Sequence, residues 1–170
     1  MEERVCKLYK KCGGCQLDMP YKEQLRYKQN LEEKLLGRFC KIEPVIGMKY
    51  PYNYRNKVQA AFGFDKRRNK IISGVYQSNS HRIVPVDHCM IEDSKADAII
   101  KDIRGLMKDF KFMPYDEDTH RGFIRHVLVK RGFSTDEIMV VIVTGTPVFP
   151  AKNNFVKALL KLHPEITTII

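Results

Sequence analysis

The chain has 170 residues, 44% of them hydrophobic and 29% charged, and a formal net charge of +10 at pH 7. This length and composition are typical of one globular domain with a single core. The longest apolar run, 138–143, is too short to span a bilayer, and the opening Met-Glu-Glu-Arg is not a signal peptide. The sequence therefore predicts a cytoplasmic protein with no membrane span.

The positive charge is clustered, which indicates a polyanionic partner, with nucleic acid favoured over an anionic membrane. The alternative is a basic surface that only keeps the protein soluble. The basic clusters are Lys7, Lys10 and Lys11; Arg55 and Lys57; Lys66, Arg67, Arg68 and Lys70; and Arg121, Arg125, Lys130 and Arg131.

The first part of the chain combines a polar segment with one helix. Residues 1–18 have no apolar period and are predicted to form a cysteine-rich loop. A helix is expected over Tyr21–Leu36, because a proline precedes it, a glycine follows it and its leucines form a partial stripe. Residues 41–53 contain two prolines and a glycine and are expected to be irregular.

The middle of the chain predicts a hairpin followed by a helix. Tyr54–Phe64 and Lys70–Gln77 have strand character and are separated by a polar turn. A short apolar segment, Ile83–Val86, comes next. A nearly complete apolar stripe then predicts a helix that begins at Asp93 or Ser94 and runs through Phe110.

The last part predicts a second hairpin, from Phe123–Arg131 and Glu137–Thr144, a short helix over Asn154–Leu162 and a final strand over Ile166–Ile170. The expected fold class is α+β, with a mainly antiparallel sheet built from two hairpins, three helices and a Cys-rich N-terminal loop. Because the last apolar strand ends on the final residue, we expect that the chain is a truncated piece of a longer protein.

The cysteines form a three-plus-one pattern. Cys6, Cys12 and Cys15 lie within ten residues, and Cys89 is remote. Five cysteines in a reducing compartment argue against disulfides. Three interpretations remain open: an iron–sulfur cluster, which tolerates a remote fourth ligand; a structural zinc ion; or thiols without a metal.

Several motifs add a resemblance to these patterns. They are Cys6-x5-Cys12-Gly-Gly-Cys15-Gln16, then Tyr54-Arg55-Asn56-Lys57, then Ser80-His81-x-Ile83-Val84-Pro85-x3-Cys89, then Arg125-His126-Val127. In this order, between residues 6 and about 144, they resemble the bacterial RNA (uracil-5-)-methyltransferase family, and its 23S rRNA branch is the most similar.

The resemblance implies a [4Fe-4S] cluster held by Cys6, Cys12, Cys15 and Cys89. It also implies S-adenosylmethionine-dependent methylation of carbon 5 of a uridine, with the target base flipped out of the RNA. In the family a catalytic cysteine attacks carbon 6 of the base, and a carboxylate later removes the proton from carbon 5. The cluster is expected to be structural, with a redox role as the alternative.

The sequence lacks the family's Rossmann-like methyltransferase domain, with its glycine-rich cofactor loop and its Ser-Cys-Asn-Pro nucleophile segment. The resemblance therefore implies that residues 1–18 and 41–170 form a central iron–sulfur and RNA-binding domain. This domain would be inactive alone, with no catalytic residue and no S-adenosylmethionine site of its own. The helical segment 19–40 is expected to pack on the missing domain and, without it, to mediate a homodimer or domain swap through residues 20–38.

The RNA-contacting candidates combine basic and aromatic side chains. The most favoured contacts are Arg55, Lys57, His81, Arg82, Arg125 and His126. Looser phosphate contacts are Lys66, Arg67 and Arg68, and candidate base-stacking rings are Tyr54, Tyr76 and Phe123, for which core packing is the alternative. Two other functions remain open: a zinc-bound nucleic-acid module with no enzymatic parent, and an iron–sulfur electron carrier.

Overall fold

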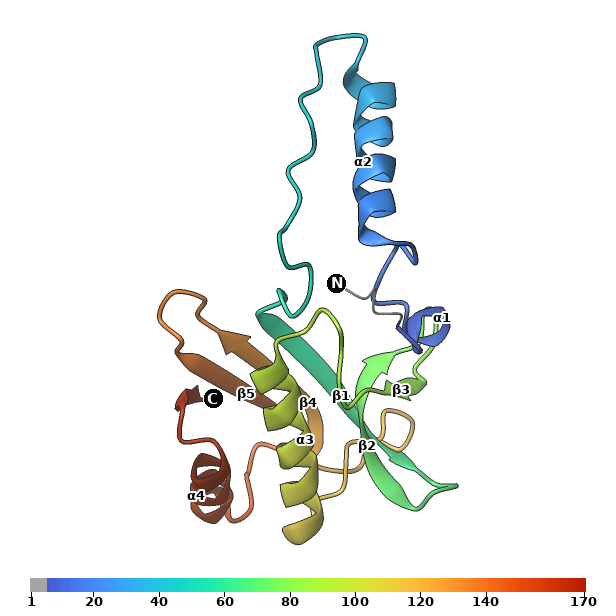
Figure 1. Ribbon diagram of the computed structural model, residues 1–170. Helices are drawn as coiled ribbons and strands as arrows, with labels where there is room; N and C mark the ends of the chain where they lie inside the picture. Colours follow the sequence, from blue (N-terminus) through green and yellow to red (C-terminus); the bar gives the residue numbers. More distant parts are fainter. Residues whose placement is uncertain (1–5) are drawn as a thin grey trace.

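The computed structural model describes residues 6–170, so the predicted 1–18 loop is seen from Cys6 onward and its first five residues lie outside the described part. The described residues form one six-stranded sheet with the strand order β3-β2-β1-β4-β5-β6 (Figure 1). The strands are β1 (Lys57–Asp65), β2 (Lys70–Tyr76), β3 (Ile83–Pro85), β4 (Ile124–Arg131), β5 (Ile138–Thr144) and β6 (Ile166–Ile169).

Four helices accompany this sheet within residues 6–170, and they are α1 (Tyr9–Cys12), α2 (Tyr21–Leu36), α3 (Ser94–Asp109) and α4 (Lys152–Leu162). None of them is both long and apolar enough to cross a lipid bilayer. The helix predicted from Asp93 or Ser94 begins where expected because the Asp93 carboxylate caps it, accepting from the backbone N–H groups of Lys95 and Ala96.

The α+β class and both predicted hairpins are confirmed, but the layout of two hairpins and three helices is wrong. β6 runs parallel to β5, and α4 makes the crossover between them, so the sheet is mixed. β3 adds a further edge strand. The helix that the sequence did not predict is α1. It spans four residues and buries none of them, so no apolar period in the sequence indicates it.

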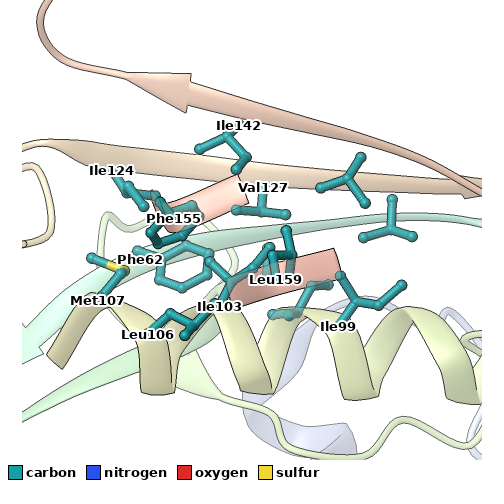
Figure 2. Close-up of a cluster of buried hydrophobic side chains, with 14 of the residues drawn as sticks. Phe62, Ile99, Ile103, Leu106, Met107, Ile124, Val127, Ile142, Phe155 and Leu159 are labelled. Atoms are coloured by element: carbon teal, nitrogen blue, oxygen red, sulfur yellow. The ribbon is translucent and has the colours of Figure 1, made fainter. Parts of the chain in front are cut away.

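The hydrophobic core lies between one face of the sheet and helices α3 and α4 (Figure 1). Alternate residues of β1, β4 and β5 point into it because side chains alternate along a strand. Figure 2 shows strand residues meeting the apolar stripes of both helices; its labelled side chains are Phe62, Ile99, Ile103, Leu106, Met107, Ile124, Val127, Ile142, Phe155 and Leu159.

Helix α2 and the extended segment after it project away from the sheet as an arm (Figure 1). The arm is held by contacts within itself. The backbone N–H of Val45 donates to the side chain of Gln29 at 2.8 Å, and the backbone N–H of Met48 donates to the Tyr21 hydroxyl at 2.7 Å. No residue of α2 is buried, so the arm adds nothing to the core described above.

Candidate metal centre and RNA-facing surface

A tight turn carries the three N-terminal cysteines. The backbone N–H of Cys12 donates to the Leu8 carbonyl at 2.8 Å and closes helix α1. Gly13 ends that helix with φ 65°, in the left-handed region that favours glycine. A Cβ at this position would collide with the Ser78 side chain, so the turn packs directly against the loop between β2 and β3.

Cys89 lies in the loop before α3, and two sets of hydrogen bonds position it. Its backbone N–H donates to the Asp97 carboxylate in the first turn of α3 at 2.9 Å. The residues after Cys89 pair with the segment before β1 through backbone hydrogen bonds. The Arg55 N–H donates to the Ile91 carbonyl at 2.8 Å, and the Arg55 carbonyl accepts from the Asp93 N–H at 3.0 Å. The fourth cysteine is therefore fixed between the start of α3 and Arg55.

The three N-terminal thiols interact electrostatically. Burial raises the pKa of the Cys15 thiol above its ordinary value, and the nearby guanidinium of Arg55 offsets part of this rise. Cys12, Cys6 and Glu92 each raise that pKa further, which indicates that all three groups lie near Cys15.

Glu92 connects Cys89 to this group. Burial, with a smaller contribution from the Glu92 and Asp97 carboxylates, raises the pKa of Cys89 to about 11. Burial also raises the pKa of Glu92 to about 7, and Asp97 adds to that rise. Glu92 thus influences the pKa of both Cys15 and Cys89, which indicates that this carboxylate lies near both thiols.

The four thiols are free and half-buried, so none of them is in a disulfide. Within residues 6–170, however, no three His, Cys, Asp or Glu side chains converge closely enough to hold one metal ion. The donor chemistry suits a thiolate-ligated centre, and Arg55 provides a cation near Cys15 that would offset its negative charge.

The structure brings two of the six predicted RNA contacts together. The rings of His81 and His126 each lie 6.1 Å from the ring of Tyr76, measured between centroids. His81 is exposed on the loop after β2, whereas His126 is half-buried on β4. Burial lowers the pKa of His126, and the neighbouring Arg125 lowers it further, so this ring favours its neutral form.

Arg125 is already engaged in ionic contacts. Its guanidinium donates twice to the Glu117 carboxylate, at 2.6 and 3.0 Å, and lies 5.5 Å from the Tyr115 ring centroid. The Tyr115 hydroxyl in turn lies 3.1 Å from Nδ1 of His120. Sequence reasoning missed this cluster because its members come from a loop and a strand that only the fold brings together.

The remaining predicted contacts lie on other segments and make no ring contact with Tyr76. Arg55 is half-buried beside the cysteines, Arg82 is exposed on the loop between β2 and β3, and Lys57 is exposed at the start of β1. The looser phosphate candidates Lys66, Arg67 and Arg68 are all exposed on the turn between β1 and β2.

Phe123 does not belong to this surface, since its side chain is 8% exposed. Its ring packs edge-to-face on Phe112 and Phe149, with centroid distances of 4.8 Å in both cases, so the core-packing alternative holds for this residue. Tyr54 and Tyr76 are 47% and 36% exposed and keep surface that a ligand can reach.

Two buried carboxyl groups beside Cys89 also escaped the sequence reasoning. Glu92 is 8% and Asp97 7% exposed. The only sequence signal is the acidic run before the helix, which predicts a cap at Asp93 but says nothing about burial of its neighbours.

Several known proteins are similar to this chain in sequence. No protein-family model matches the chain. An uncharacterised RNA methyltransferase of Halalkalibacterium halodurans is 40% identical over 174 residues, which cover 99% of this chain and 38% of that protein. Similar proteins of the same description occur in Clostridium tetani, with 41% identity over 99% of this chain and 37% of the relative, and in Staphylococcus aureus, with 35% identity over 99% and 39%.

A solved structure has the same fold. The crystal structure of Pyrococcus abyssi tRNA (uracil-54, C5)-methyltransferase, in complex with S-adenosyl-L-homocysteine, matches with a TM-score of 0.68 and 25% identity over 89% of this chain and 36% of that one. The chain is therefore similar to part of several proteins described as RNA methyltransferases, and its fold matches part of a tRNA (uracil-54, C5)-methyltransferase. It spans somewhat more than a third of the length of the proteins it matches.

Proposed function

We propose that this chain is the RNA-binding part of an S-adenosylmethionine-dependent RNA (uracil-5-)-methyltransferase that acts on ribosomal RNA. The similarity to RNA methyltransferases over 99% of the chain carries this proposal. The net charge of +10 and the exposed basic and aromatic side chains support the RNA-binding role.

The chemistry is assigned to the remainder of the enzyme, because this chain holds neither a glycine-rich cofactor loop nor a Ser-Cys-Asn-Pro segment. Deleting the gene should remove a single 5-methyluridine from 23S rRNA, detected by mass spectrometry of nuclease digests. Loss of a 5-methyluridine from transfer RNA instead would refute the ribosomal target. The 170-residue chain alone should transfer no labelled methyl group to RNA.

RNA binding by the chain itself should depend strongly on salt. If about five phosphates are neutralised, the logarithm of affinity for single-stranded RNA should fall by about 3.5 per tenfold rise in salt. Fluorescence anisotropy with a labelled oligonucleotide measures this slope. Affinity that is insensitive to salt would contradict the assignment of the basic residues to phosphate contacts.

We also propose that Cys6, Cys12, Cys15 and Cys89 hold a [4Fe-4S] cluster with a structural role. When bound, the group would supply a covalent tie between the N-terminal turn and the loop before α3. The chain's own part is to present free thiols, to fix the Cys89 backbone through Asp97 and to place Arg55 near Cys15. The proximity of Glu92 to both Cys15 and Cys89 supports the shared site.

Metal analysis of anaerobically purified protein tests this proposal. We expect iron and acid-labile sulfide near four per chain and a brown colour. Cys89→Ala should abolish the visible absorbance, whereas Cys40→Ala, a change at an exposed cysteine outside the site, should leave it unchanged. Zinc near one per chain would support the alternative zinc-bound nucleic-acid module. Reversible reduction without RNA binding would support the electron carrier.

For the helical segment 19–40, we propose packing on a methyltransferase domain in the longer enzyme and self-association in this chain alone. The support is exposure, since Leu31, Leu35 and Phe39 are 41%, 56% and 69% exposed. Light scattering should show a dimer for this chain and a monomer for the double variant Leu31→Glu, Leu35→Glu. A wild-type chain that stays monomeric at high concentration would refute the dimer.

A further inference from the structure

We propose that Tyr76 and His126 form a subsite on the open face of the sheet where one unpaired RNA base stacks, and that Lys57 and Lys130 bind backbone phosphates on the same face. The inference rests on the proposed RNA-binding function. It goes further by naming the form of RNA that is recognised, an unpaired base rather than a duplex backbone.

The sheet has one covered and one open face. Val58 of β1 pairs with Val129 of β4, and both are buried beneath the helices. Because side chains alternate along strands, the neighbouring pair of Lys57 and Lys130 lies on the opposite face, where both are exposed. The face that carries these two lysines is the open face.

Tyr76 and His126 lie on this open face. The register pairs Ala61 of β1 with both His126 of β4 and Gly74 of β2, and Tyr76 follows Gly74 by two residues. The contact between the Tyr76 and His126 rings confirms that they share a side of the sheet. The β1 residue directly opposite His126 is Ala61, so β1 places only a small side chain beside that ring.

The Tyr76 ring is held in place but is not stacked. It meets His126 at an interplanar angle of 70° and His81 at 53°, and among the described residues no ring lies parallel to it. Its side chain is 36% exposed. A fixed aromatic ring with exposed surface is what base stacking requires, and it stacks with any nucleobase because every base has a π-face.

The lysine pair favours a polyanion as the occupant. Lys57 and Lys130 stand directly opposite each other across β1 and β4, an arrangement in which like charges repel. Among the described residues neither lysine forms an ion pair with a carboxylate. A phosphate bound between them would relieve the repulsion. Lys130 lies four residues from His126 on β4, about 13 Å away, so one short RNA segment can reach both.

Arg125 is not part of this subsite, although its neighbour His126 is. Its guanidinium makes two hydrogen bonds to Glu117, which balances its charge locally.

A protein partner is the other possible occupant of the open face, because the half-buried Val141 and the 41% exposed Val143 lie on the same face. The unbalanced lysine pair favours RNA.

Anisotropy titrations of the full chain test the proposal with three labelled probes: a single-stranded oligouridylate, the same length of abasic strand and an RNA duplex. Tyr76→Ala should weaken binding to the oligouridylate by about 5- to 150-fold, the value of one stacked base. Tyr76→Phe should retain the affinity. Phe133→Ala, at a 91% exposed ring in the turn between β4 and β5, is the matched control and should have no effect.

The abasic strand separates stacking from charge. Tyr76→Ala should leave its affinity unchanged, whereas Lys57→Ala and Lys130→Ala should weaken all three probes and each lower the salt slope by about 0.7 on single strands. Unchanged circular dichroism and melting temperature of each variant would show that the fold is intact.

The outcomes distinguish this inference from the proposed function. A wild-type chain that binds none of the probes would reject RNA binding itself. Binding that Tyr76→Ala does not weaken would reject only the stacking subsite, as would equal weakening on the oligouridylate and the abasic strand. Capture of a protein partner that competes with the oligouridylate and needs Tyr76 would also overturn it.

Discussion

Helices α2 and α3 are both 16 residues long, yet they have opposite relations to the rest of the molecule. α3 buries seven of its residues, and the six apolar ones among them belong to the core, whereas α2 buries none. α3 also begins with a side-chain cap at Asp93, while Pro20 at the start of α2 offers no such cap. The difference shows that an apolar stripe alone does not place a helix in a core.

Packing partners account for this difference. α3 lies across the sheet with its stripe facing strand residues, so each buried side chain is removed from water (Figure 2). α2 contacts the extended segment that follows it. There the backbone N–H of Val45 donates to the Gln29 side chain, and the backbone N–H of Met48 donates to the Tyr21 hydroxyl. We therefore expect the stability of this chain to depend on α3 and α4 and to be nearly indifferent to α2.

The largest expected effect is in the core. Phe155→Ala removes a fully buried ring that packs against Phe110, Phe112 and Phe149, and it should lower the free energy of unfolding by about 3–5 kcal/mol. Urea unfolding measures this loss. At dilutions where the chain is monomeric, the matched change Leu35→Ala on α2 should stay within about 0.5 kcal/mol, because this side chain is 56% exposed. A comparable loss for both variants would show that the arm is part of the cooperative core.

The cap of α3 should give a smaller effect. The Asp93 carboxylate accepts from two backbone N–H groups and pairs with Arg131 at 2.8 Å. Asp93→Ala should therefore cost about 1–2 kcal/mol in urea unfolding. Asp93→Asn keeps a capping oxygen and should cost less, and Ser94→Ala at the exposed neighbouring position should be neutral. Equal losses for the alanine and asparagine variants would exclude the capping contribution.

The smallest effect concerns acid stability. Hydrogen bonding to Arg131 is the main cause that lowers the pKa of Asp136, and Lys95 of α3 adds to it. A carboxyl group whose pKa is lower in the folded state stabilises the fold above its ordinary pKa of about 3.9, and this contribution is lost as the pH falls further. Asp136→Asn should therefore show a shallower loss of melting temperature between pH 5 and pH 3 than the wild type.

The corresponding change on the arm is Glu23→Gln. Glu23 and Arg26 are 3.9 Å apart and both exposed, a pair that contributes little in water. Its acid profile should match that of the wild type. A profile as altered as that of Asp136→Asn would mean that α2 is packed more tightly than its exposure indicates.

Local signals predicted most of the secondary structure. The helix over Tyr21–Leu36 was located to the residue, and the α3 start follows from a capping aspartate before an apolar stripe. The parallel β6 was not predictable in this way, because strand direction depends on the crossover through α4 and not on the strand's own residues.

The candidate site was predictable only in part. The cysteine spacing predicts the four thiols as candidate ligands, but the position of Glu92 near Cys15 and Cys89 depends on the hydrogen bonds between Arg55 and the residues before α3. Among the RNA candidates, the sequence could not separate Arg125, which Glu117 engages, from Lys57, which has no such partner among the described residues. Both are basic residues on predicted strands, and only the fold determines their neighbours.

The sequence by itself determined three of the four helices that the structure describes, both hairpins, the cysteine pattern and the resemblance to RNA methyltransferases, because these depend on local residue order. Only the tertiary structure decided which helix is packed and which is exposed, which face of the sheet is open, and that Tyr76 meets His126 there. These properties depend on contacts between residues far apart in the chain, which local periodicity does not encode.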